Sequence, residues 1–548
     1  MLQINETLKK LILAEAQELN FFGKRKRETR IWCAKEIIEA LAIQSELTEN
    51  EFAKAEDLAP TLADWLLKQK PEKPASNKPA SSKPAASTVV AGLQKVEQLP
   101  EIEGDKFLVV GVQNNTAPHA DFAALKAFAE AEGYKLICLP IWYNKNAFSA
   151  AVEDDTERFD SVFNMTMEDC SLFGGRVSLR PSAAILPTAK RPENAAKELN
   201  QGELVTIVPS PKQHLLTLPR APQQPIKEAY STGCVTAINY TRSRAGRVAE
   251  KNHTIGGVCL WRTDDDTVLT HNVSVRNGQV MSIDNHTELL ERPAVVLGDL
   301  HSEMKDGLCW AKTLDFVRGI EPCLVAVHDI LHFSTKSHHN RNDGLHLYKT
   351  QDDSVLVDLE RVITDINDLA AEVPLVYIVE SNHNSALDNW LHDISYNPKR
   401  DPRQAKIYYL LNYLVCEAID NGDDKATALQ VAFEHLDSFE QLPELAENVK
   451  FGSMKQAFYV YGVDLSQHGH KGQNGSGGNT NLFSQWGLPM VTGHTHSPAI
   501  VGDVLTVGVT AKLDQGYNAG GASSWRQSHG IIFPNGTKQI YHVFGLTY

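Results

Sequence analysis

The sequence lacks the features of a membrane protein and of a disulfide-stabilised secreted protein. No apolar run is long enough to cross a bilayer. The first twenty residues contain no small-residue cleavage site, which argues against a signal peptide. The eight cysteines form no C-x-x-C pair, so neither a zinc ribbon nor a disulfide framework is indicated. We therefore expect a cytoplasmic protein without a membrane span, whose thiols are reduced and buried.

The chain also carries no excess of positive charge. Its formal net charge is −15, and an acidic chain is not an obvious nucleic-acid binder because contacts to phosphates need Lys and Arg. Nuclease sites are an exception, since their carboxylates are neutralised only when metal ions bind. The charge therefore weighs only mildly against DNA as a ligand.

Composition divides the chain into four regions. Apolar residues at helical spacing predict a small helical module over residues 1–70. Residues 71–103 form a Pro/Ala/Ser/Lys linker that cannot bury a core. A basic cluster at residues 24–30 has two interpretations, a solvated helix end or a docking module for nucleic acid or a partner. An accessory α/β domain is predicted at 104–290, and the last region spans 291–548.

The accessory region begins with a strand–helix–strand unit. We predict a strand over Lys106–Val112, a helix over Asp121–Glu132 and a strand over Tyr134–Ile141. The unit lacks the G-x-G-x-x-G turn of dinucleotide-binding proteins. Residues 180–290 alternate short β-like runs with Pro and Gly turns. Three isolated residues there are interpreted as structural: His214, Cys234 and His253.

In the last region, apolar runs repeatedly end in clusters of polar side chains. Five such blocks occur in order: Pro293–Leu297 before Asp299 and His301, Cys323–Val327 before Asp329, Leu375–Val379 before Asn382 and His383, Ala457–Tyr461 before His468 and His470, and Pro489–Val491 before His494 and His496. Buried strands of this length end at one edge of a sheet, so we expect the loops that follow them to meet in space.

The residue types in these blocks indicate a metal centre. Asp, His and Asn together suit Mn²⁺, Fe, Zn²⁺ or a similar ion, and the mixture is too rich in nitrogen for Ca²⁺. Alternate residues in Asp299-x-His301 and His494-x-His496 can direct two ligands towards one cluster from a tight loop. A single histidine of this kind is usually a satisfied polar residue, so the interpretation depends on the five blocks together.

With these five blocks in this order, residues 293–510 resemble the calcineurin-like metallophosphoesterases, including the nuclease subunits of double-strand-break repair complexes. The resemblance implies an α/β (α+β) fold in which a β-sandwich flanked by helices holds two metal ions. It implies these ligands: Asp299, His301 and His496 for the first metal, Asn382, His468 and His494 for the second, and Asp329 bridging both. It also implies that His383 contacts the phosphate or protonates the leaving oxygen.

Three positions depart from the family pattern. His328 stands where Gly usually precedes the Asp of the second block, and Ser381 where Gly usually precedes the Asn of the third. We expect these two changes to reshape loops only. Asn384 stands where the third block usually ends in Asp or Glu. An amide would orient His383 less firmly, so we expect this departure to affect the proton-donor role and not the metal ligands.

Some residues near the blocks are candidates for substrate contact. His332, His338 and Arg341 follow the second block in a polar stretch that either lines the mouth of the site or forms a hydrated loop. His470, in the fourth block, is a further candidate. The glycine-rich segment 471–478 would let backbone approach a substrate.

A helical insertion is predicted at about residues 385–450, between the third and fourth blocks. Helical patterns cover Gln404–Ala418 and Lys425–Phe439. The insertion would form a cap or a surface that binds a partner. Together with the N-terminal module, it is where we expect a protein partner or a second copy of the chain to bind.

These observations predict a metal-dependent phosphodiesterase that acts on DNA with two divalent ions, Mn²⁺ before Fe, Zn²⁺ or Mg²⁺. The layout of the chain also resembles the large metallophosphoesterase proteins of tailed bacteriophages, some of which degrade DNA early in infection. That resemblance implies the cytoplasm of a host cell. Two alternatives stay open: a phosphatase or phosphodiesterase for small or protein phosphates, and a DNA-transfer or scaffold protein with a structural metal centre.

Overall fold

The computed structural model describes residues 99–143, 158–333 and 354–546, with short gaps at 222–223, 394–395, 398, 400–401, 424–426, 440–441 and 517. The chain divides into two units, Met1–Leu93 and Gln94–Tyr548, and all described residues belong to the second. The predicted N-terminal module with its basic cluster lies outside the described residues, as do His338 and Arg341. Below, the accessory part means the described residues up to 290, and the C-terminal part means those from 291.

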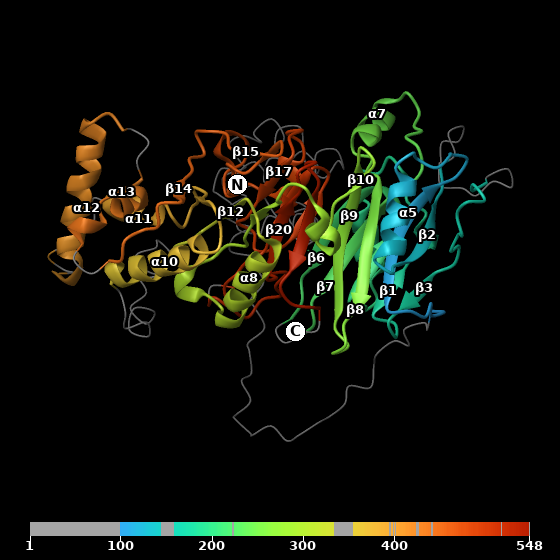
Figure 1. Ribbon diagram of the computed structural model, residues 1–548, viewed down its shortest axis with the longest axis horizontal. Helices are drawn as coiled ribbons and strands as arrows, with labels where there is room; N and C mark the ends of the chain where they lie inside the picture. The colour runs from blue at the N-terminus through green and yellow to red at the C-terminus, as the bar shows by residue number, and fades with distance from the viewer. Residues whose placement is uncertain are drawn as a thin grey trace, which may run out of the picture. The chain divides into compact units, whose positions relative to one another are not determined.

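The first sheet has five strands in the order β10-β9-β8-β1-β2. The expected strand–helix–strand unit is confirmed, because β1 (Lys106–Gln113) pairs in parallel with β2 (Lys135–Ile141) and α5 (Phe122–Ala131) connects them (Figure 1). α5 buries a face of residues at helical spacing: Phe122, Leu125, Phe128 and Ala129. The remaining strands are antiparallel: β8 (Gly256–Arg262), β9 (Val268–Arg276) and β10 (Gln279–Val280).

The second sheet has six strands in the order β14-β13-β12-β11-β20-β21. Four are parallel: β11 (Ala294–Val296), β12 (Leu324–Val327), β13 (Val376–Ile378) and β14 (Val449–Phe451). β20 (Ser528–Ile532) and β21 (Lys538–His542) complete it in antiparallel pairing. α8 (Gly307–Ile320) follows β11, and α10 (Val355–Ala370) follows β12. Parallel strands end at the same edge, so the loops after β11, β12 and β13 lie together.

The third sheet has ten strands and contains residues from both sides of position 290. The accessory part supplies β3 (Cys170–Leu172), β4 (Val177–Leu179), β5 (Val205–Val208), β6 (Ser210–Leu218) and β7 (Lys227–Gly233). The C-terminal part supplies β15 (Tyr459–Val460), β16 (Val463–Asp464), β17 (Met490–Thr492), β18 (Ala499–Val501) and β19 (Val504–Thr506). The two groups join where β18 pairs with β6, with Ala499 opposite Leu216 and Ile500 opposite Leu215.

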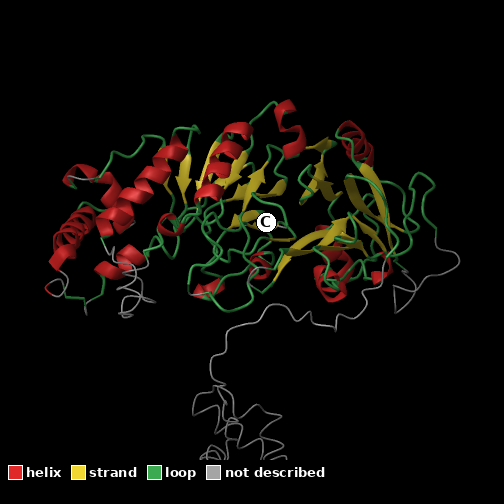
Figure 2. Cartoon of the chain, turned by 90° about the horizontal axis from the view of Figure 1, so that it is seen from below, coloured by secondary structure: helices red, strands yellow, loops and turns green. Residues whose placement is uncertain are grey.

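Strand residues of the second sheet alternate between two apolar cores. Val295 and Val325 pack with α8, α10 and the helical insertion, whereas Val296 and Ala326 face a core shared with β17 and β19. Successive side chains of a strand point to opposite faces of the sheet, and here each face meets an apolar core. Both faces of these strands are therefore buried, which explains why their sequences are apolar without interruption. In Figure 2 helices gather at one end of the described part, beyond the strands, where Figure 1 places α10 to α13.

The predicted helical insertion is built from α11 (Ala386–Leu391), α12 (Pro402–Asp420), α13 (Ala428–Glu434) and the 3-10 turn η5 (Leu436–Ser438). α12 contains the helix predicted over Gln404–Ala418. The helix predicted over Lys425–Phe439 is shorter than expected. The Thr427 side chain caps α13 at its start, and the backbone leaves the helical conformation at His435.

Residues 180–290 also form two helices that the expectation of short β-like runs did not include. These are α6 (Glu193–Leu199) and α7 (Arg244–Lys251). The Ser243 side chain caps α7 by accepting a hydrogen bond from the Gly246 N–H. Short helical turns lie elsewhere: η1 (Pro181–Ala183), η2 (Ile283–Glu288), η3 (Ser302–Met304), η6 (Gln473–Gly475) and α14 (Thr480–Phe483).

Two expectations from composition concern the whole described part. None of its helices has both the length and the apolar character that crossing a bilayer requires. Its seven cysteines are free, and five are buried as expected, whereas Cys323 is half-buried and Cys416 is exposed.

Candidate metal centre

The loops that follow five strands meet between the second and third sheets. Asp299, Asp329 and Asn382 come after β11, β12 and β13, while His468 comes after β16 and His494 after β17. Backbone hydrogen bonds tie these loops together. The His301 N–H donates to the Asp329 carbonyl over 2.7 Å, and the Gly493 N–H donates to the His468 carbonyl over 2.7 Å. Blocks that are distant in the sequence are therefore joined directly.

A first group of ligand atoms comes from four buried residues, Asp299, His301, Asp329 and His496, whose ligand atoms all lie within 4.8 Å of one another. The His496 Nε2 atom is 3.1 Å from Asp299 Oδ2 and 3.0 Å from His301 Nε2. His301 Nε2 is 3.9 Å from Asp329 Oδ2. Two carboxylates and two imidazoles at this spacing form a donor set that fits one divalent cation.

A second group of ligand atoms comes from Asp329, His468 and His494, again within 4.8 Å of one another. His468 Nε2 is 3.0 Å from Asp329 Oδ2. The Asn382 Oδ1 atom is buried and has no hydrogen-bond partner among the described residues. Asp329 belongs to both groups. The donor atoms therefore form two adjoining sets that share one carboxylate.

Backbone strain is concentrated at the same residues. Four of them have a positive φ: His301 at 44°, Asp329 at 41°, His494 at 74° and His496 at 57°. Non-glycine residues rarely adopt this left-handed conformation, and each such residue costs about 1–3 kcal/mol. The alternating side chains of D-x-H and H-x-H loops reach one point because the backbone turns sharply here. Strain at four ligand positions is typical of a functional site.

Gly493 is needed for a close approach between the two sheets. A Cβ atom at this position would lie 2.2 Å from Asp299 Oδ1. Any side chain would therefore push Asp299 out of the first group. The Asp299 carboxylate also accepts a hydrogen bond of 2.8 Å from the His494 N–H, which fixes its other oxygen.

Several buried polar atoms of the cluster have no hydrogen-bond partner among the described residues. They include Asp299 Oδ1, Asp329 Oδ2 and His468 Nε2. His468 Nε2 and Asp329 Oδ2 are close, but they are not aligned for a hydrogen bond. Leaving such atoms unpaired costs about 1–3 kcal/mol each, and more where they are charged. A bound cation would satisfy these atoms together, so the residues present fit a metal centre.

The pKa values of Asp329, His301 and His468 are those expected of side chains that bind a cation. Burial would raise the pKa of the Asp329 carboxyl, but His468, His383 and His301 together hold that pKa well below its ordinary value. Burial, followed by the neighbouring His383, lowers the pKa of His301 well below its ordinary value. Burial would also lower the pKa of His468, but Asp329 and Asp299 outweigh it and raise that pKa. A cation would therefore meet an ionised carboxylate and displace a proton from His468.

His383 lies beside the first group and is held from two sides. The backbone N–H of His383 donates to Asp329 Oδ1 over 3.2 Å. The ring atom Nδ1 lies 3.0 Å from the His332 carbonyl oxygen. A carbonyl can only accept, so Nδ1 carries a hydrogen and Nε2 remains to exchange a proton. The ring centroid is 4.6 Å from that of His301.

The Asn384 side chain bonds backbone groups and not the His383 ring. The Asn384 Oδ1 atom accepts from the Leu331 N–H, and its Nδ2 donates to the Val379 carbonyl, both over 3.3 Å. Asn384 therefore fixes the loops after β12 and β13 to each other. The His332 carbonyl performs the orienting role that we looked for at position 384.

Glu303 supports this arrangement, and sequence analysis missed it. Its carboxylate accepts the N–H groups of His332 and Phe333 over 2.6 and 2.7 Å. Glu303 thereby holds the carbonyl that orients His383. The sequence did contain a signal for Glu303, because polar ionisable residues occupy every second position at Asp299, His301 and Glu303. His529 was missed as well, and nothing in the sequence marks it: its Nδ1 accepts the Gly298 N–H over 3.0 Å, and its Nε2 lies 2.9 Å from Thr313 Oγ1.

Two further histidines face the cluster. His328 is buried with its Nδ1 3.4 Å from His468 Nδ1, and burial lowers the pKa of His328 to about 4. It therefore touches a candidate ligand, whereas we expected position 328 to affect loop shape only. The ring of His470 lies 6.0 Å from that of His494, and burial lowers the pKa of His470 to about 3.

The structure thus places the predicted residues as follows. Six predicted ligands form the two groups, and Asn382 lies in the adjoining loop after β13. His332, His383 and His470 border the groups. His338 and Arg341 lie outside the described residues.

Comparison with known proteins yields a relative without a stated activity. No known protein-family model matches the chain. The chain is similar to Protein A1 of Escherichia phage T5, with 32% identity over 558 residues that cover 97% of each chain. The similarity spans the accessory part and the metal centre alike. Its source agrees with the layout resemblance to bacteriophage proteins, and its name describes no chemistry.

Proposed function

The chain belongs to the family of Protein A1, and we propose that it is a two-metal phosphodiesterase whose substrate is DNA. The observation that carries the proposal is the position of Asp329, which belongs to both groups of buried donor atoms. Two cations about 3.5–4 Å apart repel each other and need a shared carboxylate between them. A single structural metal would need only one of the two groups.

The proposal assigns each group one ion, most suitably Mn²⁺. Asp299, His301 and His496 would hold the first ion, Asn382, His468 and His494 the second, and Asp329 both. Two divalent ions bound there would polarise the phosphoryl oxygens and neutralise the charge that develops on them. The strained loops keep these ligands in position before substrate arrives, which avoids reorganisation during the reaction.

The protein's own contribution to proton transfer is His383. Because Nδ1 donates to the His332 carbonyl, Nε2 is the atom that would deliver a proton to the departing oxygen. Glu303 fixes the loop that carries this carbonyl. Glu303 therefore holds the loop at His332, and the carbonyl of that loop orients the His383 ring.

The resemblance to nuclease-type metallophosphoesterases and the size of the protein favour DNA over a small phosphate. The helical insertion and the accessory part extend the chain well beyond the loops that hold the centre. A compact phosphatase would not need them. Hydrolysis of small phosphates remains the alternative, and the experiment below separates the two.

The test is hydrolysis by the purified full-length chain with Mn²⁺, Mg²⁺, Zn²⁺, Fe²⁺ or a chelator. Substrates are supercoiled plasmid, linear duplex, single strands, a chromogenic phosphodiester and a chromogenic phosphomonoester. We expect metal-dependent cleavage of DNA and of the diester, with little action on the monoester. Preference for the monoester would assign a phosphatase instead, and no hydrolysis with any of the four metals would overturn the proposal.

A further inference from the structure

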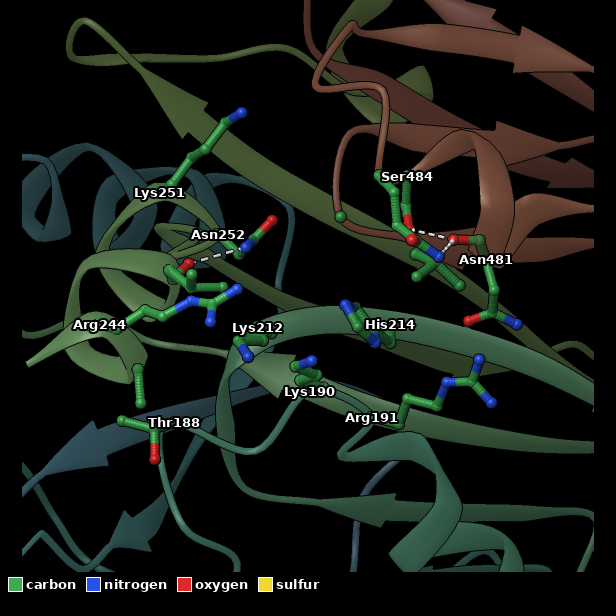
Figure 3. A pocket seen from close by; sticks show the side chains of 15 residues that line it. Thr188, Lys190, Arg191, Lys212, His214, Arg244, Lys251, Asn252, Asn481 and Ser484 are labelled. Carbon is green, nitrogen blue, oxygen red and sulfur yellow. Dashed lines mark hydrogen bonds between the residues drawn. The ribbon is translucent and has the colours of Figure 1, made fainter. Parts of the chain in front are cut away.

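A cavity of about 920 Å³ lies between the accessory part and the C-terminal part, away from the residues of the metal centre. Five cationic side chains line it: Lys190, Arg191, Lys212, Arg244 and Lys251. Figure 3 shows Arg244 and Lys251 on one side, Asn481 and Ser484 on the other, and Lys212 with His214 between them. Elements from distant parts of the sequence therefore build one basic concavity.

The positive charge continues beyond this cavity along α7. A neighbouring cavity of about 320 Å³ shares Arg244 and Lys251 with the first and adds Arg242 and Arg247. No carboxylate belongs to the described lining of either cavity. Seven cations thus collect on one face of a chain whose net charge is −15. We call the two cavities together the cationic groove.

One cation is built into the floor of the groove. Lys212 on β6 is 1% exposed, and its ammonium donates to the Ala189 carbonyl. Burial lowers the pKa of Lys212 to about 8, although Glu193 acts in the opposite sense. Glu193 itself is bound to His214, with 2.6 Å between its Oε2 and the ring Nδ1. A buried ammonium is costly unless an acceptor compensates it, and this one has donors to spare beside the cavity.

The geometry points to the sugar–phosphate backbone of a nucleic-acid strand as the ligand of the cationic groove. Seven cations exceed the charge of a single nucleotide, whereas a polynucleotide supplies phosphates at short, regular intervals. The amide and hydroxyl groups of Asn481, Ser484 and Gln485 suit phosphate oxygens. No Phe, Tyr or Trp is among the described lining residues, so the groove offers no platform on which bases could stack. Recognition is therefore of the backbone and independent of base sequence.

The groove connects to the metal centre through shared segments. Val501 and Gly502 line it five and six positions after His496, and Asn481 follows His470 by eleven positions. Five residues span at most roughly 18 Å. α7 abuts these segments, because a Cβ atom on Gly487 would lie 2.8 Å from Lys251 Nζ. Duplex DNA rises about 3.4 Å per nucleotide along each strand, so the part of the groove at Val501 would hold the backbone within roughly five nucleotides of the scissile bond.

This inference rests on the proposed function for its substrate, but its test does not need hydrolysis. The full-length chain is titrated in chelator with a labelled 30-nucleotide single strand and a 30-base-pair duplex, and fluorescence anisotropy reports binding at several salt concentrations. The groove variant is Arg244→Glu/Arg247→Glu. The matched control is Lys126→Glu/Lys135→Glu, which changes the net charge equally on exposed residues of α5 and β2. Lys190→Gln/Lys251→Gln is a milder second groove variant.

We expect the groove variant to lose at least tenfold in affinity at low salt and to lower the salt slope by about two for the duplex, because two phosphate contacts are lost. The control should retain its affinity to within about twofold. Equal losses in both variants would show a general charge effect and overturn the inference. So would a nucleoside triphosphate that competes as well as the 30-nucleotide strand, because the site would then take one nucleotide. DNA binding that survives while hydrolysis is absent would sink the proposed function alone.

Discussion

The candidate metal centre and the cationic groove differ in how deeply their charged side chains are buried. In the centre, two carboxylates and four histidines are packed into a space closed by strained loops, and most of their ligand atoms are buried. In the groove, most of the cations are exposed, and Lys212 alone forms the buried floor. The centre is suited to a small ion held in fixed geometry. The groove is suited to a large, flexible polyanion held by charge.

Removing Asp329 should have the largest effect, because this carboxylate belongs to both groups. We expect Asp329→Ala to bind neither metal and to lose all detectable hydrolysis, while its DNA affinity in chelator stays near the native value. Elemental analysis gives the metal content. Asp437→Ala, which removes an exposed carboxylate, is the control. Two metals retained per chain in Asp329→Ala would refute the bridge.

Removing the His383 ring should separate chemistry from metal binding inside the centre. We expect His383→Ala to keep both metals and to lose about 10²–10⁴-fold in turnover if the ring is a general acid. The loss should shrink for diesters with good leaving groups, which need no proton. Steady-state rates on a series of leaving groups provide the measurement. A loss independent of the leaving group would indicate phosphate binding instead.

Metal removal should test how much the centre contributes to stability. A ligand that binds only the folded state stabilises it by about 2.7 kcal/mol at a hundredfold excess over its Kd. We therefore expect a chelator to lower the melting temperature of the native chain by several degrees. The same treatment should leave Asp329→Ala unchanged. A shift of equal size in that variant would place the stabilising metal elsewhere.

Acid should destabilise the folded chain through His529. Burial lowers the pKa of His529 to about 3, below the ordinary value of about 6.5. The unfolded chain therefore takes up a proton first, and stability falls as pH drops from about 6.5 towards 3. The slope is at most about 1.4 kcal/mol per pH unit for this group. His529→Gln keeps a hydrogen-bonding side chain but does not titrate, so its melting temperature should depend less on pH. Identical pH profiles would exclude His529 as a contributor.

The clustering of the candidate ligands could be predicted from the sequence because short apolar runs precede them. Asp299, Asp329 and Asn382 mark the ends of parallel strands, and that local pattern places them at one edge. The residues of the cationic groove show no such pattern in the sequence. Lys190, Lys212, Arg244 and Asn481 lie on four separate segments. Lys212 donates to the Ala189 carbonyl, and the pairing of β6 with β18 joins the accessory segments to the C-terminal part. α7 was missed for a different reason, since it is only eight residues long and the residues that it buries, Gly246 and Ala249, are small.

His328 and Asn384 show a second limit. Both differ from the family pattern, and the sequence alone suggested altered loops or weaker support for His383. In the structure His328 lies against His468, and Asn384 bonds the backbone of Leu331 and Val379. A motif tells which residue type is unusual. Two of the three partners of the unusual residues, Leu331 and His468, lie 53 and 140 positions away in the sequence, where a local motif gives no information.

The pairing of β18 with β6 limits how this protein could have been assembled in evolution. A chain that began at residue 291 would lack β6, so β18 would expose N–H and C=O groups that now pair with β6. Open edges of this kind recruit strands from other chains and lead to aggregation. We therefore expect the region from residue 291 not to be exchanged between proteins as an independent cassette. Gene fusions and insertions should be tolerated in loops outside the ten-stranded sheet, and recombination near residue 290 should be selected against.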